Sequence, residues 1–182
     1  IANSIANIVY VPGNAFCIVI GTMVGQSLGK KNIEEAEDTM LYLVKFSSLC
    51  LLIVCAVVFP ISRFLVSLYS KESIVIDLAV DIVRLALVMV PLFWSAAFVL
   101  PAGLRGAGDV KYTMLISIAG MWLCRIVMGY VLGIRLGLGV QGVWIGMYMD
   151  WTIRGTLYLI RLKSGKWKQK KVIRSDLEAE AI

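Results

Sequence analysis

Apolar residues run along this chain almost without interruption, separated by short polar segments. The apolar stretches cover residues 5–28, 40–61, 74–100, 112–134 and 140–160. A helix needs about 20 mostly apolar residues to cross a bilayer. Lipid offers the backbone no hydrogen-bond partner, so each stretch must satisfy its own backbone groups as a helix. The pattern predicts an all-α, polytopic membrane bundle with five spanning helices.

Polar residues between the stretches predict where the helices begin and end. Gly29 suits a helix C-terminus, and Pro91 should kink the third helix because proline lacks a backbone donor. The expected N-caps of the second, third and fourth helices are Asn32, which with Glu35 forms a capping box, Ser73 and Asp109. The expected membrane unit is residues 1–162, with helices at about 5–28, 33–61, 74–100, 110–134 and 140–162, followed by a basic tail at 163–182.

Composition favours a membrane protein and argues against an enzyme. Hydrophobic residues make up 59% and charged residues 16% of the 182 residues, against about 45–50% and 25% in soluble domains. The chain has no histidine, so the usual catalytic base and metal ligand are missing. It has no glycine loop typical of nucleotide binding, and its four cysteines lack metal-binding spacing. We therefore expect no catalytic residue, no bound metal and no cofactor.

Basic residues divide unevenly between the two sides of the expected bundle. The segments 29–39, 101–111 and 161–174 carry eleven lysines and arginines, and the opposite segments carry three. Basic loops stay on the cytoplasmic side of a membrane. The chain is therefore predicted to start outside, cross the cell membrane five times and end in the cytoplasm. Attraction to anionic membrane lipid explains the basic tail without a nucleic-acid partner.

Polar side chains inside the expected first helix are candidate substrate-binding residues. Asn3, Asn7, Tyr10 and Asn14 recur at spacings of three and four, which places them on one face. Amides that faced lipid would be costly, so this face must contact protein or water. Two interpretations stay open: hydrogen bonds between helices, or the lining of a solvated substrate cavity.

Charged residues at membrane depth form a second candidate group. They are Asp81 and Arg84 in the third helix, Arg125 in the fourth, and Asp150 and Arg154 in the fifth. Asp81 is expected to pair with Arg84, and Asp150 with Arg154. Arg125 has no acidic neighbour on its own helix and needs a partner from elsewhere. Each Asp–Arg pair is either a structural ion pair or a proton or cation site that uses its aspartate, and Arg125 stays open between a structural and a functional role.

Short motifs in this chain resemble the C-terminal lobe of the multidrug and toxic compound extrusion (MATE) transporters. The motifs are Val24-Gly-Gln-Ser-Leu-Gly-Lys-Lys with the following Asn32-Ile-Glu-Glu-Ala, Gly103-Leu-Arg-Gly-Ala-Gly-Asp109, Trp122 with Arg125, and Gly139 with Gly142-Val-Trp144. Their order and the spacing of the five helices match over about residues 1–167.

The resemblance implies a transporter of twelve helices in two six-helix lobes, with the substrate bound between the lobes. This chain would supply helices eight to twelve, and its partners would be membrane lipid, the small-molecule substrate and the N-terminal lobe that it lacks. Because it opens inside an expected helix without a methionine, we interpret it as part of a longer protein. The implied mechanism is alternating-access antiport of small amphipathic cations against Na⁺ or H⁺.

The chain departs from the family pattern at Trp94. Some members carry an acidic residue about eleven positions before the arginine of the Leu-Arg-Gly segment, and this chain has Trp94 there. That cation site does not carry over, so Asp81, Asp150 or the N-terminal lobe must provide the coupling carboxylate. Trp94 is expected instead to line the substrate cavity and stack on an aromatic cation.

Two other functions fit the same residues. A lipid-linked oligosaccharide flippase of the same superfamily could use Arg84, Arg125 and Arg154 in a cationic cavity. A noncatalytic membrane scaffold could use the buried charges only for assembly.

Overall fold

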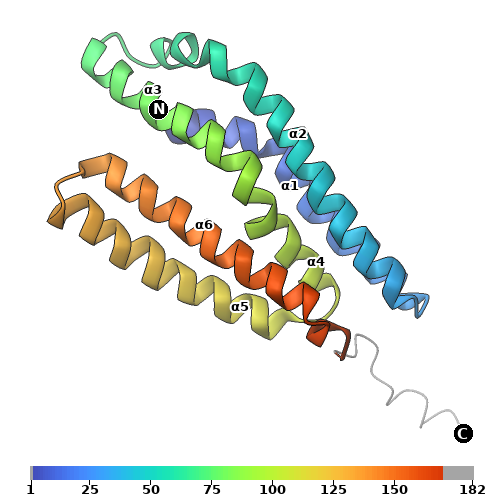
Figure 1. The fold of residues 1–182 in the computed structure, drawn as a ribbon. Coiled ribbons are helices and arrows are strands. Elements are labelled where there is room, and N and C mark those ends of the chain that lie inside the picture. The colour runs from blue at the N-terminus through green and yellow to red at the C-terminus, as the bar shows by residue number, and fades with distance from the viewer. Residues whose placement is uncertain (1, 170–182) are drawn as a thin grey trace, which may run out of the picture.

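The computed structural model describes residues 2–169, which form helices and contain no strand (Figure 1). Ile1 and residues 170–182, the distal part of the expected basic tail, lie outside the described residues. The all-α prediction is confirmed. In chain order the elements are α1 (Ala2–Gly29), α2 (Ile33–Ser67), α3 (Ser73–Met89), η1 (Val90–Val99), α4 (Leu100–Gly106), α5 (Val110–Ala119), η2 (Gly120–Met128), η3 (Val131–Arg135), α6 (Gly139–Lys163) and η4 (Lys166–Gln169).

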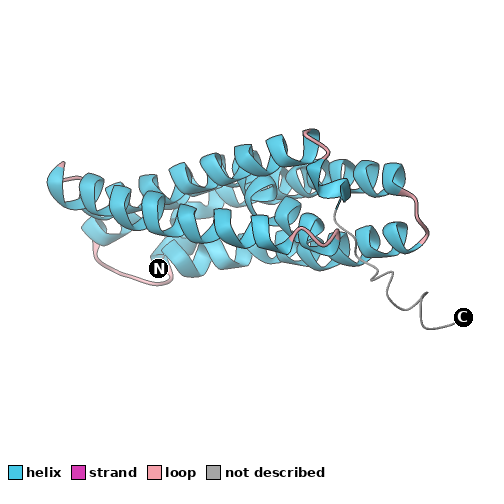
Figure 2. Ribbon diagram, turned by 90° about the horizontal axis from the view of Figure 1, so that it is seen from below, coloured by secondary structure: helices cyan, strands magenta, loops and turns pink. Residues whose placement is uncertain are grey.

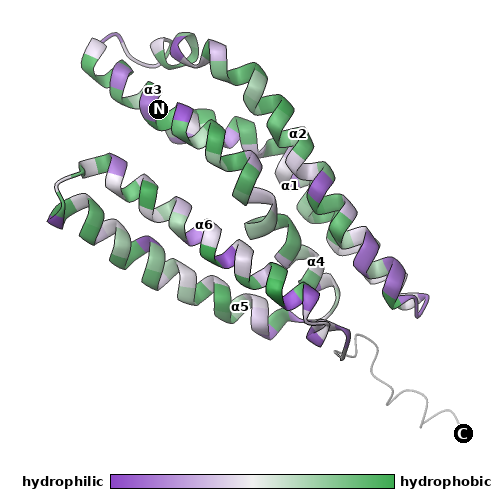
Figure 3. Cartoon of the chain, viewed as in Figure 1, coloured by the Kyte–Doolittle hydropathy of each residue, from purple (hydrophilic) through white to green (hydrophobic). Residues whose placement is uncertain are grey.

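Three helices are long and apolar enough to cross a membrane. They are α1, α2 and the helix Val110–Arg135, which comprises α5, η2 and η3. Only 17–22% of the most apolar window in each is buried within the structure, and Figure 3 shows hydrophobic residues along their length. Apolar surface of this extent needs lipid or an apolar partner. The chain is therefore a membrane protein.

The two remaining expected spans are helical, but neither is both long and apolar enough to count among the three candidate membrane-spanning helices. The third stretch is divided, because α3 has 17 residues and continues through η1 into α4. The last stretch is the 25-residue α6. Asp150 and Arg154 lower its hydropathy, as the hydrophilic positions in the middle of α6 show in Figure 3.

The long helices lie side by side with their axes roughly aligned (Figure 2). α1 packs against α2, and α6 packs against η2 and η3. The helix of α3, η1 and α4 lies between these two groups and contacts both. Its residues Val90, Val99 and Leu100 are almost fully buried, because apolar side chains from both groups cover them.

Helix α2 begins as the sequence predicts. The Glu35 backbone N–H donates to Asn32 Oδ1 at 3.1 Å, and Asn32 Nδ2 donates to Glu35 Oε2 at 3.0 Å. The first bond confirms Asn32 as the N-cap, but the second joins the two side chains, and the Asn32 backbone N–H donates to the Ser27 carbonyl instead, so the capping box forms only in part. The prediction for α3 is wrong, because Glu72, not Ser73, occupies its N-cap position. Asp109 does occupy the N-cap position of α5, as predicted, but its side chain makes no capping bond.

Pro91 lies where the middle helix changes geometry. The segment Val90–Val99 is a π-helix, in which backbone bonds span five residues rather than four. Proline supplies no backbone donor, so the wider turn begins where the α-helical ladder has already lost a bond. The kink expected at Pro91 therefore takes the form of a π-helical segment.

Glycines allow the α6 backbone to approach the preceding helix closely. A Cβ atom placed on Gly142 would lie 2.6 Å from the backbone carbon of Leu132, and one on Gly146 would lie 3.0 Å from the backbone nitrogen of Gly129. Any larger residue would force the helices apart. The spaced glycines thus act as helix-packing positions, as small residues do in membrane proteins.

Candidate functional site

A buried ion pair lies on α6 where it faces η1 and η2. Arg154 Nη2 donates to Asp150 Oδ2 at 2.6 Å, and the Asp150 side chain is 1% exposed. The two residues are one helical turn apart, so the pairing predicted from their spacing is confirmed. Mutual neutralisation lets both charges remain inside a membrane protein.

Gly120 of η2 gives the ion pair its space. A Cβ atom on Gly120 would lie 2.5 Å from Asp150 Oδ1 and 2.8 Å from Arg154 Cδ. No other amino acid fits there unless the pair moves. The Phe98 ring of η1 also packs on the guanidinium, with its centroid 5.1 Å from Arg154 Cζ. This contact is a cation–π interaction.

Aromatic rings from three elements pack beside the ion pair. Trp94 stacks on Phe98 with centroids 5.0 Å apart, and on Tyr10 of α1 at 5.7 Å. Trp151 meets Phe98 at 5.7 Å and Tyr148 at 5.4 Å, both edge-on. We call the set the aromatic cluster; its members are Tyr10, Trp94, Phe98, Trp144, Tyr148 and Trp151.

Several polar atoms of this region have no hydrogen-bond partner among the described residues. They are Tyr148 Oη, Asp150 Oδ1, Trp151 Nε1 and Arg154 Nε. All four residues are at most 9% exposed. Buried polar atoms are nearly always paired, so a cluster of exceptions calls for an explanation such as a bound water or ion. The region can thus bind a small polar species as well as hold an ion pair.

The two longest π-helical segments of the described chain flank this region. Val90–Val99 supplies Trp94 and Phe98, and Gly120–Met128 supplies Gly120 and Arg125. π-helical turns are rare and are frequent at functional sites. Apolar periodicity gives no signal for them, and sequence reasoning therefore missed them.

The α1 face predicted to line a cavity divides in two. Asn3, Asn7 and Asn14 are exposed, whereas Tyr10 is half-buried in the aromatic cluster. The expectation that Trp94 is open to a ligand does not fit this conformation. Its side chain is 3% exposed, and the Tyr10 and Phe98 rings both stack on it.

Close packing of Trp94 leads to a testable prediction. A Cβ atom on Gly13 would overlap the Trp94 ring, whereas one on Gly25, also in α1, would meet nothing within 4 Å. Gly13→Ala should therefore destabilise the protein by about 1–3 kcal/mol through overpacking, and Gly25→Ala should be neutral or stabilising, since alanine favours helix. The melting temperatures of the two purified variants test this. Equal melting temperatures would show that Trp94 is free to move.

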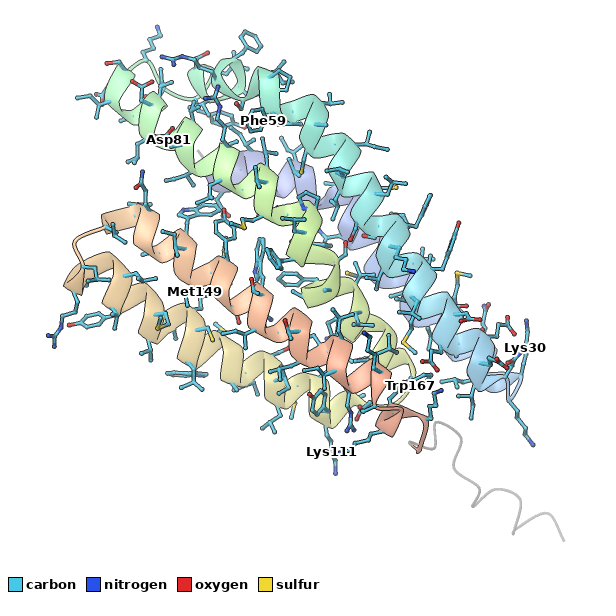
Figure 4. The ribbon with its side chains drawn as sticks, in the orientation of Figure 1. Lys30, Phe59, Asp81, Lys111, Met149 and Trp167 are labelled. Atoms are coloured by element: carbon cyan, nitrogen blue, oxygen red, sulfur yellow. The ribbon has the colours of Figure 1, made fainter. Side chains whose placement is uncertain are left out.

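The pairing predicted within the third helix is wrong. Asp81 and Arg84 are both exposed and form no ion pair with each other. Arg84 Cζ instead lies 5.6 Å from the centroid of Phe59 in α2, and Asp77 pairs with Arg63 at 3.1 Å. Asp81 and Phe59 lie toward the same end of the bundle in Figure 4. The partners of Asp77 and Arg84 both come from α2, and spacing along a single helix could not reveal them.

Arg125 lies on η2 and is exposed. Its Nη2 atom donates to the Met147 sulfur of α6 at 3.6 Å, and thioether sulfur is a weak acceptor. The prediction that its partner comes from another helix is met only by this weak contact.

An ion pair at the C-terminal end of α6 was not predicted. Arg161 binds both carboxylate oxygens of Asp109, with Nε–Oδ2 at 2.7 Å and Nη2–Oδ1 at 3.2 Å. The Asp109 side chain is 1% exposed, and Tyr112 packs 4.5 Å from Arg161 Cζ. The bond joins the start of α5 to the end of α6. Its only sequence signal was an acidic and a basic residue in loops expected on the same side.

Comparisons with known proteins identify the family of this chain. The MatE family model matches residues 1–131. The chain is 25% identical over 170 residues to a probable multidrug resistance protein NorM of Thermotoga maritima, covering 93% of this chain and 36% of the relative. It is 26% identical over 187 residues to multidrug resistance protein NorM of Aliivibrio fischeri (100% and 40%), and 26% identical over 175 residues to human multidrug and toxin extrusion protein 1 (93% and 30%). No solved structure matches.

The family match covers well over half of the chain, so the chain belongs to the MatE family of transporters, as its motifs predicted. The chain spans about a third of the length of the curated relatives it matches, from 30% to 40% in these three.

Proposed function

We propose that this chain forms most of one lobe of a multidrug efflux transporter. The observation that carries the proposal is the family match, together with relatives named for multidrug resistance or extrusion. The relatives are named as transporters, which accords with a function other than catalysis. A second lobe, implied by the family resemblance, would close the substrate cavity. Nothing in the comparisons favours the flippase or scaffold alternatives.

The proposed setting is the cell membrane. The end of the bundle that contains the C-terminus of α6 would lie in the cytoplasm. Basic residues support this orientation. Lys30 and Lys111 lie at the same end as Trp167 in Figure 4, and that end also carries Arg105, Lys163 and Lys166. Basic residues concentrate on the cytoplasmic side of membrane proteins.

The proposed substrates are small amphipathic cations. The aromatic cluster supports this, because aromatic faces attract cations and apolar ligands alike. Tyr10 forms its half-buried edge, while the exposed amides of Asn3, Asn7 and Asn14 offer polar contacts along α1. Trp94 would act beneath Tyr10, as the support that holds the Tyr10 ring in place, rather than as a direct stacking partner.

The proposed coupling carboxylate is Asp150, exchanging Na⁺ or H⁺ without a further cofactor. Among the described acidic residues, only Asp109 and Asp150 are buried, and Asp109 lies at a helix end. Asp150 lies within α6 and keeps one carboxylate oxygen unpartnered. Ionisable groups in such positions commonly mark ion pathways. Arg154 would hold Asp150 ionised until the coupling ion binds.

The efflux of ethidium from cells tests this proposal. Cells that express the full-length transporter should lose ethidium faster than control cells. When the Na⁺ and pH gradients are collapsed separately, the loss of one of them should abolish the difference. The sensitive gradient identifies the coupling ion. If the transporter reaches the membrane and efflux matches the control, multidrug export is contradicted.

A further inference from the structure

An apolar groove lies between α3 and α6, and its volume is about 350 Å³. Its walls include Leu85 and Met89 of α3, Phe93 of η1, and Met149 and Ile153 of α6. α6 packs closely on η1 and only loosely on α3, so α3 and α6 diverge toward their N-terminal ends (Figure 1). No charged residue of the described chain lines the groove, and flexible methionine side chains adapt to irregular apolar surfaces. The groove therefore suits an apolar chain.

The groove faces away from the polar side of α6. Met149 and Ile153 line the groove, whereas Met147 contacts Arg125 and Trp151 packs in the aromatic cluster. Two positions along an α-helix correspond to a rotation of about 200°, so these two pairs of α6 residues lie on opposite faces. Groups that need water or further protein lie on the Arg125 side. The groove opens on the other side.

Exposed apolar residues continue the surface beside the groove. Leu78 and Val88 of α3, Leu92 of η1 and Ile160 of α6 are 42–63% exposed. In a membrane protein a surface of this kind contacts lipid, so the groove is a recess in a lipid-facing surface. An empty recess would cost its lining side chains their packing contacts. A lipid acyl chain is the occupant that this setting supplies.

Asp81 and Arg84 mark the level of the membrane surface at the end of this groove. Asp81, Leu85 and Met89 follow one another at spacings of four, so they form one ridge of α3. Residues 85–104 contain no charged side chain, and these 20 positions span about 30 Å as a helix, the thickness of a hydrocarbon core. Asp81 and Arg84 therefore lie at the level of the lipid headgroups. Figure 4 shows Asp81 near one end of the bundle and Met149 nearer its middle.

Both charges are available to a ligand. Asp81 and Arg84 are exposed, and none of the ion pairs among residues 2–169 includes either of them. Arg84 packs on the Phe59 ring at 5.6 Å, which leaves its charge unneutralised. Residues three apart on a helix have Cβ atoms about 5–6 Å from each other. A phospholipid headgroup that joins a phosphate to an ammonium through two carbons matches this separation.

We infer that the groove and these two charges bind one phosphatidylethanolamine molecule. An acyl chain occupies the groove, the ammonium donates hydrogen bonds to the Asp81 carboxylate, and the phosphate accepts them from the Arg84 guanidinium. The charge-assisted bond to Asp81 requires a cationic donor on the headgroup, which phosphatidylglycerol lacks. The inference rests on the membrane setting of the chain and not on the proposed export function.

Native mass spectrometry of the purified full-length transporter tests the headgroup contacts. Delipidated protein is titrated with phosphatidylethanolamine and with phosphatidylglycerol that carries the same acyl chains, and the tightly bound lipids are counted. The unmodified protein should prefer phosphatidylethanolamine by about two- to fivefold, as exposed ion pairs allow. Asp81→Asn should abolish the preference, and Asp81→Glu should keep it. The control Asp77→Asn should also keep it, because Asp77 already pairs with Arg63.

A second variant tests the contact with the acyl chain. Met149→Trp places a larger side chain in the groove and should remove one tightly bound lipid from the count, for both headgroups alike. Ile160→Trp adds a bulky ring at an exposed position of α6 outside the groove lining, and it should leave the count unchanged. Met149 is itself exposed, so the variant should fold, and its melting temperature checks this.

Each outcome has a separate meaning. Loss of the preference in Asp81→Asn and loss of one lipid in Met149→Trp support the inference. Equal binding of the two lipids by the unmodified protein overturns it, as does a preference that survives Asp81→Asn. A lipid count that Met149→Trp does not change also overturns it and would assign the groove to another helix of the transporter. None of these measurements involves transport, so each failure leaves the proposed function untouched.

Discussion

Replacing Asp150 by asparagine and Arg154 by glutamine together should reduce gradient-driven efflux to the level of cells without the transporter. The double variant removes the carboxylate proposed to exchange the coupling ion. It also removes the partner charge, so no unpaired charge remains inside the bundle. Removing a whole buried ion pair is often nearly neutral for stability, whereas removing one partner costs about 3–5 kcal/mol. The double variant should therefore reach the membrane folded, and its ethidium efflux can be measured directly.

The matched control for this variant is the exposed pair at the other end of the bundle. Arg63 and Asp77 lie 3.1 Å apart, with side chains 68% and 60% exposed. Arg63→Gln with Asp77→Asn removes the same charges and should keep normal efflux. Normal gradient-driven efflux in the Asp150 and Arg154 double variant would assign the pair a structural role and place the coupling carboxylate elsewhere in the transporter.

Replacing Asp109 by asparagine should destabilise the protein more than any other single carboxylate change outside the spans. Asp109 is buried and binds Arg161 through both oxygens. Its loss leaves the Arg161 guanidinium without its anionic partner at the junction of α5 and α6. We expect a cost of about 3 kcal/mol, the lower end of the range for breaking a buried pair, because Arg161 is partly exposed.

Thermal unfolding of the detergent-solubilised full-length protein measures this effect. Asp77→Asn is the matched control, and its cost should stay below about 1 kcal/mol because the Arg63–Asp77 pair is solvent-exposed. A melting temperature for Asp109→Asn as high as that of Asp77→Asn would show that the Asp109–Arg161 bond does not hold the two helices together.

Features that depend on neighbours in the sequence were predictable. The N-cap bond from Glu35 to Asn32 and the Asp150–Arg154 pair follow from spacings of three and four residues, and both are present. The continuous apolar stretches likewise predict the helices, since burial of a backbone in lipid leaves few alternatives.

Features that depend on distant residues were not predictable. Asp109 and Arg161 are 52 residues apart, and Arg84 meets Phe59 of α2 instead of Asp81. The same limit explains the error at Trp94. Its burial depends on Tyr10 and on the space that Gly13 leaves in α1, and a single-helix pattern contains neither.

Reconstituting the full-length transporter in lipid vesicles tests the central claim most directly. An inward-directed gradient of Na⁺ or H⁺ is imposed from the side opposite the cytoplasmic face, and ethidium movement against its own gradient is followed by fluorescence. The account predicts transport that starts with one of the two gradients, stops when that gradient collapses, and is absent with the Asp150→Asn and Arg154→Gln double variant. Ethidium movement that is insensitive to both gradients, or no movement by folded protein, would contradict it.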